Sequence, residues 1–199
     1  MRLFFMTIFA ATITTASSIS AQVYPELSST TVNDFADMLS PEAEARISET
    51  LSDLEREAGA EATIVTLSSV RFYANDMSVA DYAAGLFNAW GVGDQDKGDG
   101  VLLIVFRDDS QLRLTTGTGY DAEAKERAAQ IVSEVIIPEF QNDAFEAGIE
   151  KGATAIADDL VRNVNAQSTA PTGQGSGNGY GGFSAGLAQW SRALWDGAA

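Results

Sequence analysis

The chain has 199 residues, of which 28 are acidic and 12 are basic, so its formal net charge is −16. It contains neither cysteine nor histidine. This excludes disulfide scaffolds, thiol chemistry, catalytic triads that use histidine, and zinc sites with imidazole or thiolate ligands. A metal ion would have to be held by oxygen, which favours calcium, magnesium or manganese. The excess of acid predicts that the chain repels nucleic acid and anionic membrane surfaces.

Residues 1–21 have the pattern of a secretory signal peptide. Arg2 supplies a positive start, an apolar run follows, and small residues lead to a cleavage site that we place near Ala21. The apolar run is short for a membrane span and no stop-transfer pattern follows it. A retained N-terminal anchor is the alternative. The pattern predicts a periplasmic or secreted protein with no transmembrane helix in the mature chain.

Residues 22–167 are expected to form a single domain, which begins with an extended lead-in and a strand near residues 28–35. Ser40 and Pro41 predict the start of a helix, because serine caps a helix and proline suits its first position. Gly59 predicts its end. The run 61–68 then reads as a buried strand, and residues 71–77 as a loop.

The second half of this domain begins with a capping box formed by Ser78 and Asp81, which predicts a helix that ends at Gly91. Residues 100–106 are continuously apolar, as expected for a central strand that is covered on both faces. Residues 111–120 alternate and predict a returning strand. Helices are expected over 121–140, with a kink near Pro138, and over 144–164. This order predicts an α/β fold, a three-layer α/β/α sandwich with a short mixed sheet.

The C-terminal part changes in composition. Residues 168–184 are rich in glycine and serine and predict a flexible linker. Residues 185–199 form a short amphipathic segment in which Leu187, Trp190 and Leu194 share a helical face. The segment is too short to span a bilayer. Docking on the domain, on a partner or on a membrane interface are all open, and the acidic surface favours the first two.

The stretch AWGVGDQDKGDGVLLIVF places three aspartates and a lysine directly before the central strand. A solvated loop and a site for a metal or an anion are both compatible with this pattern. The stretch is not an EF-hand, because counting from Asp94 puts Asp99 where glycine is needed and Val105 where glutamate is needed. A complete cation site would therefore need acids from elsewhere in the chain, or water.

Three further stretches accompany this one in the same order: VNDFADMLSPEAEARI, the GTGYD turn, and IIPEF followed by AGIEKGATAI. With them the chain resembles the TPM-domain family. The resemblance implies an α/β/α domain on the non-cytoplasmic side of a membrane. Plant relatives in the thylakoid lumen look like acid phosphatases, and calcium binding is associated with the domain. Many bacterial relatives carry a transmembrane helix before a glycine-rich tail, and this chain lacks that helix.

The resemblance adds Asp34 and Asp121 to the acidic loop as candidate ligands, because ligands bind beyond strand ends in α/β sheets. We expect them to meet Asp99 there and, with Asp96, to hold a divalent cation, with calcium favoured. Lys97 is the candidate contact for a substrate or anion. Two functions follow. One is an interaction and maintenance module for envelope proteins, whose protein partner is unknown, with a membrane-associated protein as one candidate. The other is a cation-dependent acid phosphatase that hydrolyses phosphate monoesters.

Overall fold

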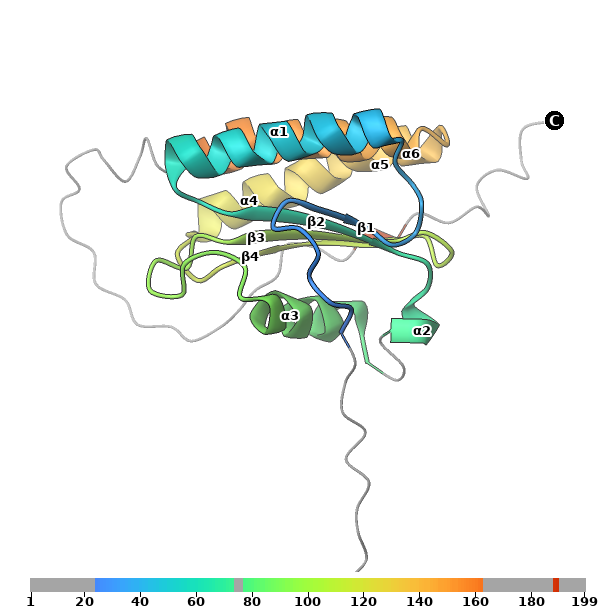
Figure 1. Ribbon diagram of the computed structural model, residues 1–199, viewed down its shortest axis with the longest axis horizontal. Coiled ribbons are helices and arrows are strands. Elements are labelled where there is room, and N and C mark those ends of the chain that lie inside the picture. Colours follow the sequence, from blue (N-terminus) through green and yellow to red (C-terminus); the bar gives the residue numbers. More distant parts are fainter. Residues whose placement is uncertain (1–23, 74–76, 163–187, 190–199) are drawn as a thin grey trace, which may run out of the picture.

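The computed structural model describes residues 24–73, 77–162 and 188–189, and within them a mixed sheet lies between two layers of helices (Figure 1). The strand order is β1-β2-β3-β4-β5. The strands are β1 (Val32–Asp34), β2 (Ala62–Leu67), β3 (Val101–Phe106), β4 (Gln111–Thr116) and β5 (Ala188–Gln189). The first three are parallel, β4 is antiparallel to β3, and β5 is antiparallel to β4. This confirms the predicted three-layer α/β fold.

Helices α1, α4, α5 and α6 cover one face of the sheet, and α3 covers the other (Figure 1). The helical elements are α1 (Pro41–Ala58), α2 (Val70–Tyr73), α3 (Val79–Trp90), α4 (Ala122–Gln130), η1 (Ile131–Ile136), α5 (Ile137–Gln141), α6 (Phe145–Ala155) and η2 (Ile156–Arg162). The segments η1 and η2 are π-helical. No helix in the described part of the chain is long and apolar enough to cross a membrane.

The ends of α1 and α3 are where the sequence predicts them. The side chain of Ser40 accepts the backbone N–H of Ala43, and Gly59 ends α1 in the left-handed conformation with φ 70°. Ser78 caps α3 in the same way, by accepting the N–H of Asp81. These local signals work because caps satisfy backbone groups that have no partner inside the helix.

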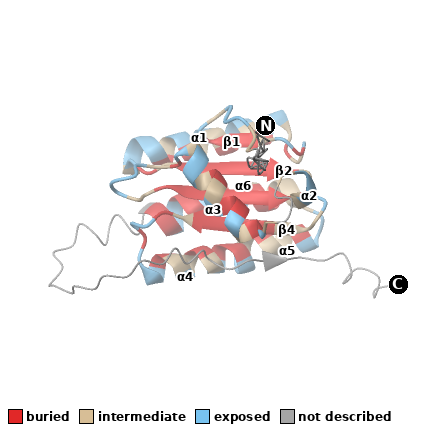
Figure 2. Ribbon diagram, turned by 90° about the horizontal axis from the view of Figure 1, so that it is seen from below, coloured by how far each residue is buried: buried red, intermediate tan, exposed pale blue. Residues whose placement is uncertain are grey.

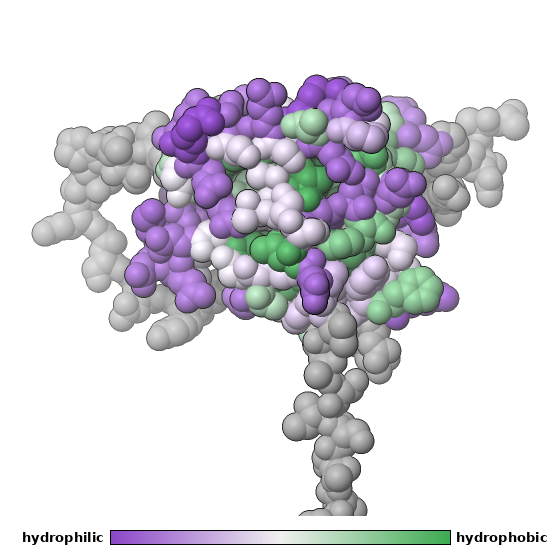
Figure 3. Space-filling view, in the orientation of Figure 1, coloured by the Kyte–Doolittle hydropathy of each residue, from purple (hydrophilic) through white to green (hydrophobic). Residues whose placement is uncertain are grey.

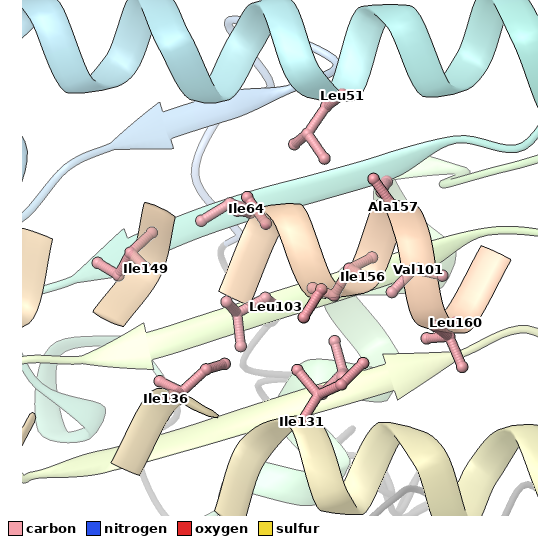
Figure 4. Packing of buried hydrophobic residues seen from close by; sticks show 14 of the residues in the cluster. Leu51, Ile64, Val101, Leu103, Ile131, Ile136, Ile149, Ile156, Ala157 and Leu160 are labelled. Carbon is pink, nitrogen blue, oxygen red and sulfur yellow. The ribbon is translucent and has the colours of Figure 1, made fainter. Parts of the chain in front are cut away.

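Each face of the sheet has its own apolar core. Leu103 points to the face under α1, η1 and α6, where Ile64, Ile136, Ile149 and Ile156 lie around it (Figure 4). Figure 2 shows the buried strands between partly exposed helices. Fully burying one such leucine or isoleucine contributes about 1.5–3 kcal/mol. Because β3 is buried on both faces, residues 101–106 do not alternate between apolar and polar side chains.

The other core lies between the sheet and α3. Leu102 and Ile104 of β3 pack there with Tyr82 and Leu86 of α3. The N-terminal segment also reaches this layer. The indole of Trp90 donates a hydrogen bond of 2.8 Å to the carbonyl of Pro25.

The helix predicted over 121–140 is present as α4, η1 and α5. In η1, just before Pro138, the N–H of Ile137 bonds to the carbonyl of Val132, five residues back. Proline donates no backbone hydrogen bond, which favours such a rearrangement of the turn.

Two expectations need correction. Part of the predicted loop 71–77 lies in the short helix α2. Within the predicted amphipathic segment 185–199, residues 188–189 form β5, and its other residues lie outside the described part of the chain.

Candidate functional site

The direction of the strands separates the predicted carboxylates. Asp34 ends β1, which runs parallel to β3, whereas Asp99 precedes β3 and therefore lies at the opposite end of the sheet. Asp121 follows β4, which is antiparallel to β3, so it shares the end of Asp99. A strand of six residues spans about 20 Å. This corrects the expectation that Asp34, Asp99 and Asp121 meet beyond one end of the sheet.

The carboxylate of Asp34 shapes the loop that leads into α1. It accepts the N–H of Met38 at 2.9 Å and the N–H of Leu39 at 2.8 Å. The hydroxyl of Thr66 is a third donor. These donors occupy both carboxylate oxygens, so Asp34 has a structural role at its own end of the sheet.

The acidic loop before β3 is folded by its own carboxylates. Asp94 accepts the N–H of Lys97 at 3.2 Å and the N–H of Asp96 at 2.8 Å. These two bonds, with the Lys97 N–H contributing most, hold the pKa of Asp94 below its usual range. Asp99 in turn accepts the N–H of Asp94 at 2.8 Å. Figure 3 shows hydrophilic residues gathered at this end of the molecule.

Lys97 and Asp121 also have partners in the structure. The ammonium of Lys97 lies 3.8 Å from the carboxylates of Asp94 and Asp99. Asp121 caps α4 by accepting the N–H of Ala124 at 2.8 Å. Within the described ranges, no three acidic side chains are grouped so that they could hold a metal ion. These carboxylates therefore do not fit a calcium cage, and the acidic loop has the geometry of a self-capped turn.

Glycines lock this loop onto the turn after β4. The N–H of Gly119 donates to the carbonyl of Gly98 at 3.0 Å, and the N–H of Gly117 donates to the carbonyl of Gly100 at 2.9 Å. Gly98 has φ 64°, and a Cβ there would lie 2.6 Å from the nitrogen of Gly119. Only glycine fits such a backbone approach without displacement.

A pocket of about 490 Å³ opens between these two loops and α3. Asp94, Gln95 and Gly98 line it from the acidic loop, and Phe87 and Asn88 line it from α3. The end of β4 supplies the remaining polar wall, residues 115–118. The pocket combines apolar and hydrogen-bonding groups on a fixed backbone, as small-ligand sites do.

Arg113 is the residue near this pocket that sequence reasoning missed. It is paired with Ile104 across the β3–β4 ladder, and Ile104 packs against α3, so Arg113 faces the same layer. Its side chain is buried, with 4% of the residue exposed, and this burial lowers the pKa of the guanidinium. The signal in the sequence is an arginine within an alternating strand whose two faces are both expected to be covered.

Several polar atoms in this layer have no hydrogen-bond partner among the described residues. They are the Nε of Arg113 and the hydroxyls of Thr115 and Tyr82; the hydroxyl of Thr116, on the other face of β4, also has none. Leaving one such buried group unsatisfied costs about 1–3 kcal/mol, and more when the group is charged. Native structures contain few of these, so a run of them calls for a physical explanation.

The outer edge of β4 is open in the described part of the chain beyond its first two residues. β5 pairs only with Gln111 and Leu112. Because Gly117 donates to Gly100, the alternation of an antiparallel ladder directs the N–H of Thr115 toward β3 and the N–H groups of Leu114 and Thr116 outward. A strand edge of this kind is able to pair with a further extended segment.

Comparisons with known proteins agree with this fold. The family model of the TPM domain matches residues 32–159. The chain is similar to the solution structure of the N-terminal domain of a protein from P. gingivalis, with 25% identity and a TM-score of 0.59 over 68% of this chain and 83% of that one. It also resembles the N-terminal domain of the cg2496 protein from Corynebacterium glutamicum, with 13% identity and a TM-score of 0.53 over 79% of this chain and 94% of that one. The search of curated proteins found no match.

Proposed function

Because the chain belongs to the TPM-domain family, we propose that it works as an exported interaction module, which binds an extended segment of an envelope protein along the outer edge of β4. The observation that carries this proposal is the edge itself. It is open beyond Leu112 in the described residues and yet already accepts two residues of β5 in antiparallel register. Strand addition to an exposed edge is a common way for domains to bind peptides.

The surroundings of the edge support a binding role. The pocket lined by residues 115–118 lies at the end of β4, where it would accommodate a side chain of a docked segment. The loops around it are held by the contacts of Gly98 with Gly119 and of Gly100 with Gly117. A fixed backbone lowers the entropy that binding must overcome.

The charge of the chain narrows the class of partner. A formal net charge of −16 disfavours nucleic acid and anionic lipid. Export through the N-terminal signal would place the domain among envelope or secreted proteins. We propose a binding role and no catalytic one, because the chain contains no histidine or cysteine and the carboxylates of Asp34, Asp94 and Asp121 accept backbone donors in caps and turns.

Site-specific cross-linking tests the proposal in cells that produce the protein. A photoreactive residue at the exposed position Thr118 is expected to give a discrete adduct with one exported protein. The same probe at Glu49, which is exposed on α1 over the opposite face of the sheet, is expected to give none. Identical adducts from both positions, or none from Thr118, would contradict the proposal.

Two substitutions at one position separate strand pairing from side-chain contact. Thr116→Pro removes an N–H that points outward and leaves the ladder to β3 intact, so the variant should fold and lose the Thr118 adduct. Thr116→Val keeps the N–H and removes only the hydroxyl, so the adduct should persist. An adduct that survives in Thr116→Pro would show that the partner binds without using the β4 edge.

A further inference from the structure

Arg113 is a buried cation between α3 and the sheet, with no counter-ion among the residues that the structure describes. In an acidic chain, four arginines of the described part each form an ion pair: Arg46, Arg56, Arg107 and Arg127. Arg113 is 4% exposed and forms no ion pair with any described residue. A buried charge is normally paired or coordinated, because removing it from water without compensation is unfavourable.

Polar groups without partners among the described residues lie along β4 from Arg113 toward the pocket. Arg113 and Thr115 alternate on the same face of β4, and successive residues of one face lie about 7 Å apart along a strand. An arginine side chain spans a comparable length. Thr115 lines the pocket, and its hydroxyl has no partner among the described residues.

The charges at the mouth of the pocket do not oppose an anion strongly. Asp94 is the acidic residue that lines it. Its charge is offset by the ammonium of Lys97 at 3.8 Å and by two backbone N–H donors. Thr115 lines the pocket with a hydroxyl that has no partner among the described residues, and the buried Arg113 lies two residues away on the same face of β4. A donor beside a positive charge is an arrangement that stabilises an oxyanion.

We infer that Arg113, with the hydroxyl of Thr115, forms the inner subsite of this pocket and binds the oxyanion group of a ligand, a carboxylate or a phosphate. The planar guanidinium presents two parallel N–H groups to two oxygens of such a group. The threonine hydroxyl donates to one of the same oxygens. The site is separate from strand pairing at the β4 edge, so it stands even if no protein partner binds there.

NMR titration of the full mature chain with inorganic phosphate, and separately with acetate, tests this inference at constant ionic strength. Saturable shifts of the backbone amides of Thr115 and Gly117 are expected over the millimolar range. A response to phosphate alone would show that the site binds a phosphate group, and a response to acetate alone would show that it binds a carboxylate. A response to both would show that the site binds either group. Absence of any saturable response would overturn the inference.

Matched variants identify the groups that bind. Arg113→Met replaces the charge with an apolar chain of similar length and should weaken binding about tenfold or more. Arg71→Met removes an exposed positive charge on α2 and should leave binding unchanged. Should Arg113→Met fail to fold, Thr115→Val, which keeps the shape and removes one donor, should still weaken binding several-fold. Equal affinity in wild type and in whichever of these two pocket variants folds would overturn the inference.

Discussion

The phenol of Tyr120 donates a hydrogen bond of 2.9 Å to the backbone carbonyl of Asp99, and this bond joins the turn after β4 to the acidic loop before β3. Burial, with a smaller contribution from the charge of Asp99, raises the pKa of Tyr120. The phenol therefore remains a neutral donor at physiological pH. The stretch of acids before β3 has a structural explanation in this bond and in its own Asp94 and Asp99 caps.

Tyr120→Phe should destabilise the domain by about 1–2 kcal/mol, because it removes a buried donor and leaves the carbonyl of Asp99 without this bond. Urea unfolding followed by circular dichroism measures the change. A free energy of unfolding equal to that of the wild type would mean that the two loops are held together without this bond.

Gly98 and Gly91 both adopt the left-handed backbone conformation, so Gly98→Ala and Gly91→Ala form a matched pair of substitutions. Both have positive φ, 64° and 66°, so each alanine carries a backbone cost of about 1–2 kcal/mol. A Cβ at Gly91 meets open space, whereas a Cβ at Gly98 would lie 2.5 Å from the Thr118 hydroxyl oxygen. Gly98→Ala should therefore cost about 2 kcal/mol more in thermal or urea unfolding. Equal losses would contradict the close docking of the two loops.

Because the carboxylate of Glu61 is half-buried, we expect the stability of the domain to depend on pH. This carboxylate accepts the N–H of Gly93, but burial, the largest cause, raises its pKa above the ordinary 4.5. The folded state thus favours the protonated form of Glu61. The stabilisation that this protonated carboxyl gives the folded state is fully present below pH 4.5 and is lost as the pH rises through the higher folded pKa. The difference in unfolding free energy between Glu61→Gln and wild type should shift in favour of glutamine from acidic to neutral pH. A constant difference would show that burial of Glu61 has no effect on its titration.

Calcium should bind only weakly, because the candidate carboxylates are divided between two ends of the sheet and accept backbone donors. Calorimetric titration of the mature chain is expected to show no saturation at micromolar calcium. Saturable micromolar binding that Asp99→Asn abolishes would contradict this geometry and restore the acidic loop as a metal site.

The sequence predicts most of the fold because its signals are local. Ser40, Pro41 and Gly59 set the limits of α1 through groups within one turn of each end. The apolar run 101–106 identifies the central strand, and the alternation over 111–116 identifies the strand beside it. Such patterns depend on a few neighbouring residues and on the period of the side chains.

The arrangement of the candidate site depends on contacts between segments far apart in the chain, which local sequence patterns do not reveal. Whether Asp34 and Asp99 share an end follows from the parallel pairing of β1, β2 and β3, which is a long-range property. The burial of Arg113 follows from the placement of α3 over β4. Pro138 predicts an irregularity in its helix, but the period of the side chains does not show that it takes the form of the π-helical turn η1.

Hydrogen exchange at β4, measured on the full chain with and without the protein that cross-linking identifies, tests the central claim most directly. The amides of Leu114 and Thr116 point outward, and their exchange should slow markedly when the partner binds. The amide of Thr115 points toward β3 and serves as an internal reference that should change little. Unchanged exchange at Leu114 and Thr116 in the presence of bound partner would contradict strand pairing at the β4 edge.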